Sequence, residues 1–277
     1  MSDIRTSGFQ NMPMVVKNLL IINGLFFLAT LVPPNQIGFD VIEFFGMHYF
    51  TSEFFKPHQI ITHMFMHGGF EHIFFNMFAL WMFGSVLENV WGPKRFLIFY
   101  LVCGIGGALT HSAVTAYQIH QVQGDINIFF QSATIENFHV LFQQHQNLIN
   151  SEYLNQLNTL LGSWANEPQS ASYILQAKIL AQKLTAMEAN IPVVGASGAV
   201  FGLLLAFGML FPNTYLYLIF PPIPIKAKWF VILYGGAELF FGVTGSQAGV
   251  AHFAHLGGML FGFILIKLWN KNRRQFF

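Results

Sequence analysis

Charged residues are scarce in this chain. Asp, Glu, Lys and Arg make up 9% of its 277 residues, whereas ordinary soluble domains carry roughly 25%. The net charge of +1 provides no basic patch of the kind that nucleic-acid partners require. The one cysteine, Cys103, excludes an internal disulfide, and its apolar surroundings predict a buried small side chain. We expect no cleavable signal peptide, because the first apolar stretch (14–32) is too long for one and runs into Pro33 and Pro34.

Apolar residues account for 54% of the chain and aromatic residues for 17%, with 33 Phe and 25 Gly. Lipid-facing aromatic side chains and glycines at helix contacts are typical of membrane proteins. A helix needs about 20 residues to cross the hydrocarbon core of a bilayer. Six apolar segments come near that length and predict an all-α membrane protein with a six-transmembrane-helix bundle: 14–33, 68–90, 96–117, 195–211, 229–247 and 250–269.

The long polar segment between the third and fourth spans is an insertion rich in Gln and Asn. Its apolar residues recur at spacings of three and four within 135–162 and again within 173–184. That periodicity predicts amphipathic helices outside the membrane. The expected organisation is an N-terminal segment (1–13), spans one to three (14–117) with an outer loop (34–62), the helical insertion (118–193), spans four to six (194–270) and a basic tail (271–277).

Lysine and arginine are divided unevenly between the two sides of the expected bundle. Of the 13 Lys and Arg residues, three fall on the side of the outer loop and the insertion, namely Lys56, Lys178 and Lys183. The other side holds the rest: Arg5, Lys17, Lys94, Arg95, Lys226, Lys228, Lys267, Lys271, Arg273 and Arg274. Because cytoplasmic loops are enriched in Lys and Arg, we expect a multi-pass plasma-membrane protein with both termini in the cytoplasm and the insertion outside.

A serine among small residues opens the fourth apolar segment, in Gly195-Ala196-Ser197-Gly198. A hydroxyl inside hydrocarbon is unfavourable unless it has a partner. Small residues here fit a close crossing of two helices, and the glycines equally allow a substrate backbone to approach the serine. Position 199 is alanine, so the motif differs from the G-x-S-x-G elbow of the α/β-hydrolases.

The sixth segment supplies a candidate partner for this hydroxyl. His252 and His255 lie three residues apart in it, and either could form a serine–histidine pair with Ser197. Gly258 and Gly262 share a helix face with His255 and allow that face to approach a neighbouring helix closely. The spacing therefore favours His255 as the proton acceptor.

Two further polar residues, His72 and Asn76, lie one helical turn apart in the second span. They could bond neighbouring helices, or they could donate hydrogen bonds to an oxyanion together with the serine N–H. Counted at 1.5 Å per residue from the helix ends, Ser197, His255 and Asn76 fall roughly 8–10 Å below the outer membrane boundary, and His72 roughly 4 Å. Polar groups from three spans therefore share one layer.

A metal site is the alternative that the histidines raise, because His63 and His67 are also four residues apart. The stretch His67-x-x-x-Glu71-His72 matches neither HExxH nor HxxEH, and no cluster of Cys or Asp adds ligands. We therefore expect neither a metal nor another cofactor. Glu238 falls inside the fifth span, where an ionisable side chain needs a partner or a proton, and the sequence assigns it no role.

In combination these motifs resemble the rhomboid family of intramembrane serine proteases. The resemblance covers about residues 10–117 and 190–270 and implies the compact six-span arrangement that is common in prokaryotes. The matching stretches are His63-x-x-x-His67-x-x-x-x-His72-x-x-x-Asn76 at the second span, Gly195-Ala196-Ser197-Gly198 at the fourth, and Ala254-His255-Leu256-Gly257-Gly258-x-x-x-Gly262 in the sixth.

The family implies a catalytic dyad at Ser197 and His255, without an acidic third member, and an oxyanion site at His72 and Asn76. It implies a serine endopeptidase whose substrates are single-span membrane proteins, cut in or near the bilayer. Phe201 falls where the family often has a tyrosine packed against the histidine. The large insertion departs from the shortest family members, and a Trp-Arg pair that some members carry in the first loop is absent.

Two other classes of protein are compatible with a bundle of this kind. A catalytically inactive rhomboid-like protein would bind transmembrane helices, but such proteins lack the serine or the histidine, and this chain has both Ser197 and His255. A transporter or channel would carry polar groups along a whole pathway, whereas these groups gather near the outer face. Labelling of Ser197 by a fluorophosphonate separates the enzyme from both alternatives.

Overall fold

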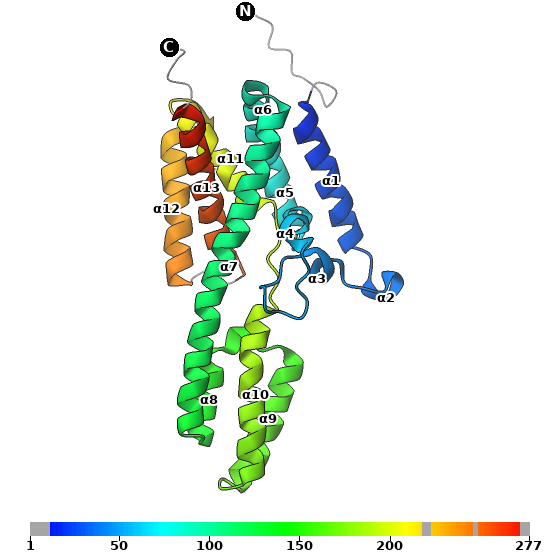
Figure 1. Ribbon diagram of the computed structural model, residues 1–277, viewed down its shortest axis with the longest axis vertical. Helices are drawn as coiled ribbons and strands as arrows, with labels where there is room; N and C mark the ends of the chain where they lie inside the picture. The colour runs from blue at the N-terminus through cyan, green and yellow to red at the C-terminus, as the bar shows by residue number, and fades with distance from the viewer. Residues whose placement is uncertain (1–11, 218–222, 246–248, 272–277) are drawn as a thin grey trace, which may run out of the picture. The chain divides into compact units, whose positions relative to one another are not determined.

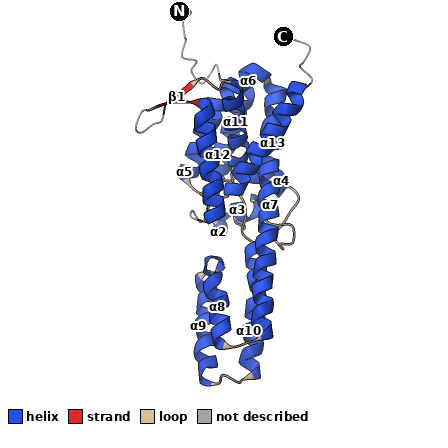
Figure 2. Ribbon diagram, turned by 90° about the vertical axis from the view of Figure 1, so that its left-hand side faces the viewer, coloured by secondary structure: helices blue, strands red, loops and turns tan. Residues whose placement is uncertain are grey.

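The structure, a computed structural model, describes residues 12–217, 223–245 and 249–271. Regular structure in these ranges is almost entirely helical, with two short strands (Figures 1 and 2). The expected N-terminal segment up to residue 11 and the basic tail from residue 272 lie outside the described residues. The chain divides into two compact units: the first comprises Met1–Met47, Lys56–His111 and Pro192–Phe277, and the second comprises His48–Phe55 and Ser112–Ile191.

The first unit contains most of the apolar helices. Its longer helices are α1 (Met14–Thr30), α5 (Phe70–Ala79), α6 (Ser85–Trp91), the first half of α7 (Pro93–Gln131), α11 (Ser197–Leu210), α12 (Ala227–Thr244) and α13 (His252–Lys271). Its short elements are α2 (Pro34–Ile37), α3 (Val41–Phe45), α4 (Gln59–Thr62), the 3-10 turn η2 (His63–Phe65) and the antiparallel strands β1 (Tyr215–Tyr217) and β2 (Pro224–Lys226).

Helices α5 and α6 form one continuous rod, because a π-helical turn, η3 (Leu80–Gly84), joins them without a break. Among the described residues, the resulting Phe70–Trp91 helix, α7 and α13 are long and apolar enough to cross a membrane, and α1 and α11 are shorter apolar helices. A helix satisfies its own backbone hydrogen bonds, as a bilayer demands. The expected helical membrane architecture is thus confirmed, while the count of six spans stays a prediction.

Helix α11 lies at the centre of the core of the first unit, and most of its residues are buried. Its most extensive contact is with α13, and both helices contact α12 (Figure 1). A Cβ on Gly258 would overlap the carbonyl group of Gly198, and a Cβ on Gly262 would lie 3.4 Å from the Cα of Gly202. The predicted small-residue stripe of the sixth span therefore packs backbone to backbone against a second stripe on α11.

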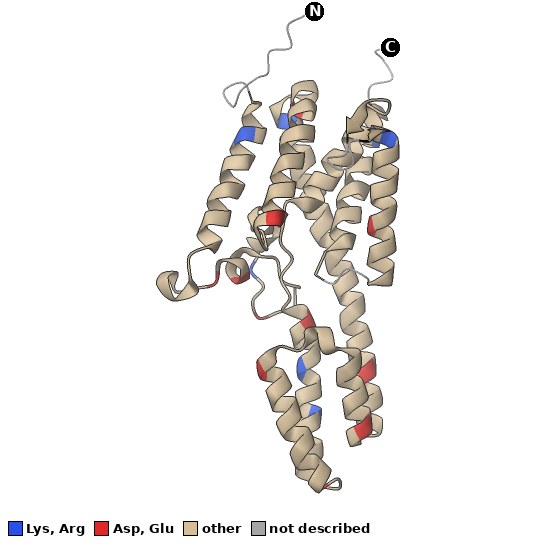
Figure 3. Cartoon of the chain, turned by 180° about the vertical axis from the view of Figure 1, so that it is seen from behind, with Lys and Arg blue, Asp and Glu red and all other residues tan. Residues whose placement is uncertain are grey.

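Lys and Arg residues gather at one end of the helices of the first unit (Figure 3). At this end the Arg95 guanidinium lies 4.1 Å from the Trp269 ring centre, which ties the start of α7 to the end of α13. Glu88, also buried here, accepts the N–H groups of Val15 and Val16 at 3.0 and 2.8 Å. A carboxylate at these unpaired N–H groups stabilises the start of α1.

The second unit has its own apolar core. It contains the second half of α7 together with α8 (Ile135–Gln144), η4 (Gln146–Leu148), α9 (Ser151–Asn166) and α10 (Ala171–Ala189). Phe138, Leu157, Trp164 and Leu184 are among its buried residues. The helices predicted from the spacing of apolar residues in this part of the chain are present, while their place outside the membrane stays a prediction.

The helix that contains the third expected span continues beyond residue 117, where hydrophobicity falls and the span is predicted to end. Helix α7 continues to Gln131, and Val122, Ile126 and Phe129 follow helical spacing into the core of the second unit. The added stretch is polar but contains no proline, and Gly124 is isolated, so nothing in it stops a helix. The change in composition marked the end of the apolar surface and not the end of the helix.

Candidate active site

Ser197 is the first residue of α11, and the backbone before it adopts a special conformation. Gly195 has a φ of +125°, a region that residues with a side chain rarely adopt. Its N–H donates to the carbonyl of His63 at 2.9 Å, and a Cβ on it would lie 2.8 Å from His72 Nε2. Glycine is therefore required here both for conformation and for space. The N–H groups of the first turn of α11 lack helical acceptors and face this bend.

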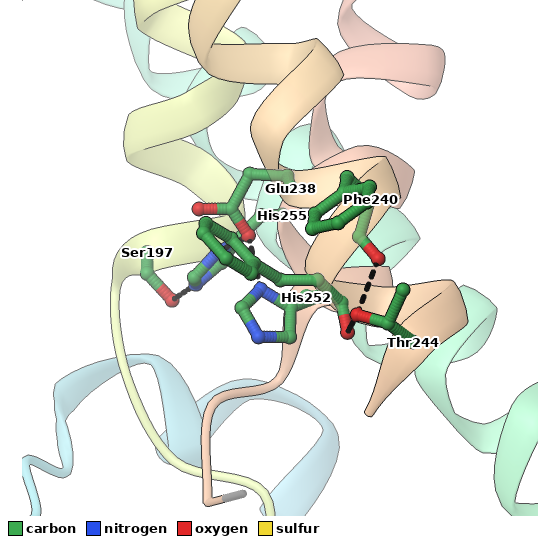
Figure 4. A network of polar contacts seen from close by, with 7 residues as sticks. Ser197, Glu238, Phe240, Thr244, His252 and His255 are labelled. Atoms are coloured by element: carbon green, nitrogen blue, oxygen red, sulfur yellow. Dashed lines mark hydrogen bonds and ion pairs between the residues drawn. The ribbon is translucent and has the colours of Figure 1, made fainter. Parts of the chain in front are cut away.

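His255 brings its imidazole to the serine hydroxyl. It lies in the first turn of α13, and its Nε2 is 2.9 Å from Ser197 Oγ (Figure 4). The contact between Gly258 and Gly198 lies one turn along α13 from His255 and sets the spacing of the two helices. Among the described residues, the structure thus pairs the serine with His255 and not with its rival His252.

An aromatic stack holds the plane of the imidazole. The Phe201 ring lies parallel to the His255 ring, with 4.2 Å between the ring centres and 5° between the planes. Tyr234 of α12 stacks on Phe201 at 5.1 Å. The stacking expected at Phe201 is therefore confirmed. It restricts rotation of the imidazole and covers one of its faces.

His72 and Asn76 lie on α5 beside the bend that precedes the serine. His72 Nδ1 accepts the N–H of Gly68 at 3.3 Å, so in the neutral ring Nε2 carries the proton. That Nε2 is the atom nearest to a Cβ on Gly195, and Ser197 Oγ would lie 3.4 Å from the same Cβ. Asn76 is buried, and its amide donates to the His72 carbonyl at 2.8 Å. The structure therefore brings His72 to the serine, while the Asn76 amide is bound to its own helix.

A buried carboxylate lies behind the histidine. Glu238 projects from α12, and its Oε2 is 2.8 Å from His255 Nδ1 and 2.7 Å from His252 Nδ1 (Figure 4). The resemblance implied no acidic third member, yet the structure places an acid on the far side of the imidazole from Ser197. Polar contacts inside the bundle thus join α12 to α13.

The rhomboid domain model matches residues 55–124 and 169–271, which together make up more than half of the chain. The chain belongs to the rhomboid family. The first matched segment contains His72, and the second contains Ser197 and His255. The family assignment and the cluster of polar side chains therefore concern the same part of the molecule.

Named relatives of this rhomboid protein come from bacteria and mitochondria. YdcA of Bacillus subtilis (strain 168), whose name places it with the rhomboid proteases, is 27% identical over 164 residues, covering 57% of this chain and 79% of YdcA. The rhomboid protease GlpG of Haemophilus influenzae is 29% identical over 110 residues, covering 39% of this chain and 52% of GlpG. Rhomboid protein 1, mitochondrial, of Saccharomyces cerevisiae is 25% identical over 221 residues, covering 78% of this chain. The chain spans 44% of the yeast protein.

The histidines before the second span of this rhomboid protein are packing residues of the loop. His63 Nδ1 bonds the carbonyl of Gln59 at 2.9 Å, and the His67 ring packs edge-on against His72 at 5.1 Å. Burial lowers the pKa of both His63 and His67 to about 4, so both rings are neutral at pH 7. Neither ring belongs to a group of three or more ligand-type side chains among the described residues.

Sequence reasoning missed the contact made by Glu238. The available signals were an ionisable residue inside a span and two histidines three residues apart on the next span. Their meeting depends on the rotation of α12 about its own axis, which a sequence of apolar residues on all faces does not define. The partners of Glu238 therefore come from the structure alone.

Proposed function

We propose that this rhomboid protein is an intramembrane serine endopeptidase with Ser197 as nucleophile and His255 as general base. The observation that supports this most directly is the 2.9 Å distance between Ser197 Oγ and His255 Nε2. Serine is a weak nucleophile unless a neighbouring base takes its proton. The names of its bacterial relatives YdcA and GlpG agree with a protease.

The proposed reaction begins when His255 Nε2 takes the hydroxyl proton of Ser197. The oxygen forms a bond to the scissile carbonyl carbon, and the carbonyl electron pair moves onto its oxygen. When the tetrahedral intermediate collapses, the C–N bond breaks, and His255 returns the proton to the leaving amine. Water then attacks the ester with the same base, which releases the carboxylic acid product and restores Ser197.

The negative oxygen of the intermediate needs hydrogen-bond donors fixed in advance. His72 Nε2–H and the N–H groups at the start of α11 serve this purpose in our proposal, because both line the bend at Gly195. Asn76 contributes once its amide turns from the His72 carbonyl toward the oxyanion. No cofactor takes part in this scheme.

The substrates in this proposal are single-span proteins of the same bilayer. A transmembrane helix keeps its backbone groups bonded internally, so a substrate must unwind locally before Ser197 reaches a carbonyl. Six spans, both termini in the cytoplasm and an outward-facing insertion at 118–193 complete the proposal for a plasma-membrane enzyme. Helix-weak residues such as glycine near the cleaved bond favour unwinding.

Replacement of either member of the pair tests this function. We expect Ser197→Ala and His255→Ala each to reduce cleavage of a single-span substrate by on the order of 10⁴-fold or more, because each removes an atom of the first proton transfer. Cleavage is followed in detergent by product mass spectrometry, with thermal unfolding measured alongside. A fluorophosphonate should label the wild-type protein and leave Ser197→Ala unlabelled. Absence of both wild-type cleavage and labelling would instead favour an inactive rhomboid-like protein that binds transmembrane helices.

A further inference from the structure

The proposed mechanism gives Glu238 no task, although its carboxylate contacts the general base. The residue is 7% exposed, and its Oε2 lies within hydrogen-bond distance of Nδ1 of both His252 and His255. An ionisable group inside a helix bundle in a membrane is costly and needs such partners. Helices α12 and α13 are held together at this point by these contacts.

Glu238 Oε2 faces Nδ1 of both His252 and His255, and this geometry limits where the protons of the three groups can lie. A protonated carboxyl oxygen has one hydrogen and donates to one ring only, whereas an ionised oxygen accepts from both rings. With the carboxylate ionised, both contacts of Glu238 Oε2 are hydrogen bonds when His252 and His255 are each protonated at Nδ1. A neutral His255 in that tautomer has its lone pair on Nε2, the atom that faces Ser197. This is the tautomer that a general base requires.

A metal ion is the competing explanation for the cluster, and the distances disfavour it. Zinc binds nitrogen and oxygen ligands at about 2.0–2.2 Å, which separates two ligands by roughly 3.0–3.5 Å at angles of 90–110°. The two contacts of Glu238 Oε2 are shorter, at 2.7 and 2.8 Å. These are lengths of charge-assisted hydrogen bonds, so the side chains bond to one another.

The geometry points to Glu238 as the positioning residue of the general base, which makes the serine–histidine pair a Ser197–His255–Glu238 relay. This inference rests on the proposed function, since it requires His255 to take the serine proton. When the proton reaches Nε2, positive charge spreads to Nδ1–H, next to the carboxylate, which stabilises it without taking the proton. His252 acts through Glu238, because it donates the second hydrogen bond that holds Oε2 in place.

The test compares kcat and KM of variants on one single-span substrate in detergent. We expect Glu238→Gln to lower kcat by at least about 10²-fold, because the neutral amide neither enforces the tautomer nor stabilises the imidazolium. KM should stay within about threefold, since Glu238 does not reach the substrate in this scheme. Glu238→Asp keeps the charge and should recover a substantial part of the lost kcat. The rate of fluorophosphonate labelling should fall and recover in parallel.

Glu88→Gln is the matched control, because it changes another buried carboxylate, one that bonds the start of α1. It should retain kcat even if its unfolding temperature falls. Wild-type kcat in Glu238→Gln, with Ser197→Ala inactive, overturns the relay and leaves the proposed function standing. An inactive and unlabelled wild-type protein overturns the proposed function itself.

A second measurement needs no variant and keeps the inference testable if Glu238→Gln does not fold. Nitrogen-15 chemical shifts of histidine-labelled wild-type protein report which ring nitrogen carries the proton. We expect His255 to be protonated at Nδ1 and bare at Nε2, with the signal assigned by its loss in His255→Ala. The opposite tautomer in the resting protein would contradict the relay.

Discussion

At the scale of single residues, the proposed mechanism uses histidine in two opposite ways. His72 accepts a hydrogen bond at Nδ1 from Gly68 and thereby presents Nε2–H as a donor. His255 faces the Glu238 carboxylate with Nδ1 and thereby presents a bare Nε2 as an acceptor. In each ring the hydrogen bond at Nδ1 determines whether Nε2 carries a proton and donates, or is bare and accepts.

The bend before the serine gives a prediction at this scale. Gly195→Ala introduces a Cβ at a φ of +125° and 2.8 Å from His72 Nε2, so the backbone is strained by about 1–3 kcal/mol and His72 must move. We expect the unfolding temperature to fall. Loss of one oxyanion donor should reduce kcat by about 10²-fold or more. Cleavage assays and thermal unfolding in detergent measure the two effects.

Gly24→Ala is the control for this substitution. A Cβ on Gly24 meets nothing within 4 Å, and the residue lies inside α1. Alanine is preferred over glycine in a helix, so this variant should retain both stability and kcat. Equal losses in the two variants would show that the bend at Gly195 has no special role.

At the scale of elements, α11 and α13 carry the proposed nucleophile and the proposed base, and glycines set the distance between the two helices. Gly258→Ala places a methyl group against the carbonyl of Gly198, so the two helices must separate and the contact between Ser197 and His255 must lengthen. We expect kcat to fall by about 10²-fold or more, since misplacement by about 1 Å has effects of that size. The loss of stability should be about 1–3 kcal/mol.

Gly236→Ala provides the comparison, because a Cβ on Gly236 of α12 meets nothing within 4 Å. This variant should match the wild type in cleavage and in thermal unfolding. If Gly258→Ala also retains full kcat, the glycine contact does not set the catalytic spacing.

The elements also show what the sequence can predict. The apolar periods of the insertion predict its helices, and the glycine spacing at Gly258 and Gly262 predicts the close face of α13, because both depend on local order along one helix. The extent of α7 beyond residue 117 and the second glycine stripe on α11 were missed. For α7, the change to polar residues was taken as the end of the helix. For α11, the face that contacts another helix is known only once the two helices are packed together.

The candidate site also contains residues that the sequence predicts and one whose contacts it does not predict. Ser197, His255 and His72 were predicted as site residues because each lies in a recognisable spacing. The structure places His255 within hydrogen-bond distance of Ser197, and His72 beside Gly195, while their catalytic roles stay a proposal. Glu238 could not be joined to them in advance, since its contacts with His252 and His255 cross between two helices of undefined rotation.

At the scale of the whole molecule, buried neutral histidines make the folded state sensitive to acid. Burial lowers the pKa of His63 and His67 to about 4, below the ordinary value of 6.5. Between those values the unfolded chain binds more protons than the folded one, so stability falls as pH falls. Lowering the pH from 7 to 5 should cost about 2 kcal/mol for each histidine.

Thermal unfolding at pH 7 and pH 5 measures this effect, with His67→Gln as the test variant. The variant should lose less stability between the two pH values than the wild type, whatever its stability at pH 7. An identical loss in both proteins would show that His67 does not contribute to the acid sensitivity.

The contact of Gly198 with Gly258 has a consequence for how such a protein diverges. The distance between the proposed nucleophile and base depends on main-chain atoms of Gly198 and Gly258, which approach closely because glycine has no side chain. Substitutions of lipid-facing residues elsewhere do not change that distance, because no bulky side chain lies at the contact between the two glycines. Extensive turnover of sequence, such as the 27% identity shared with YdcA over their aligned part, is therefore compatible with an unaltered reaction geometry.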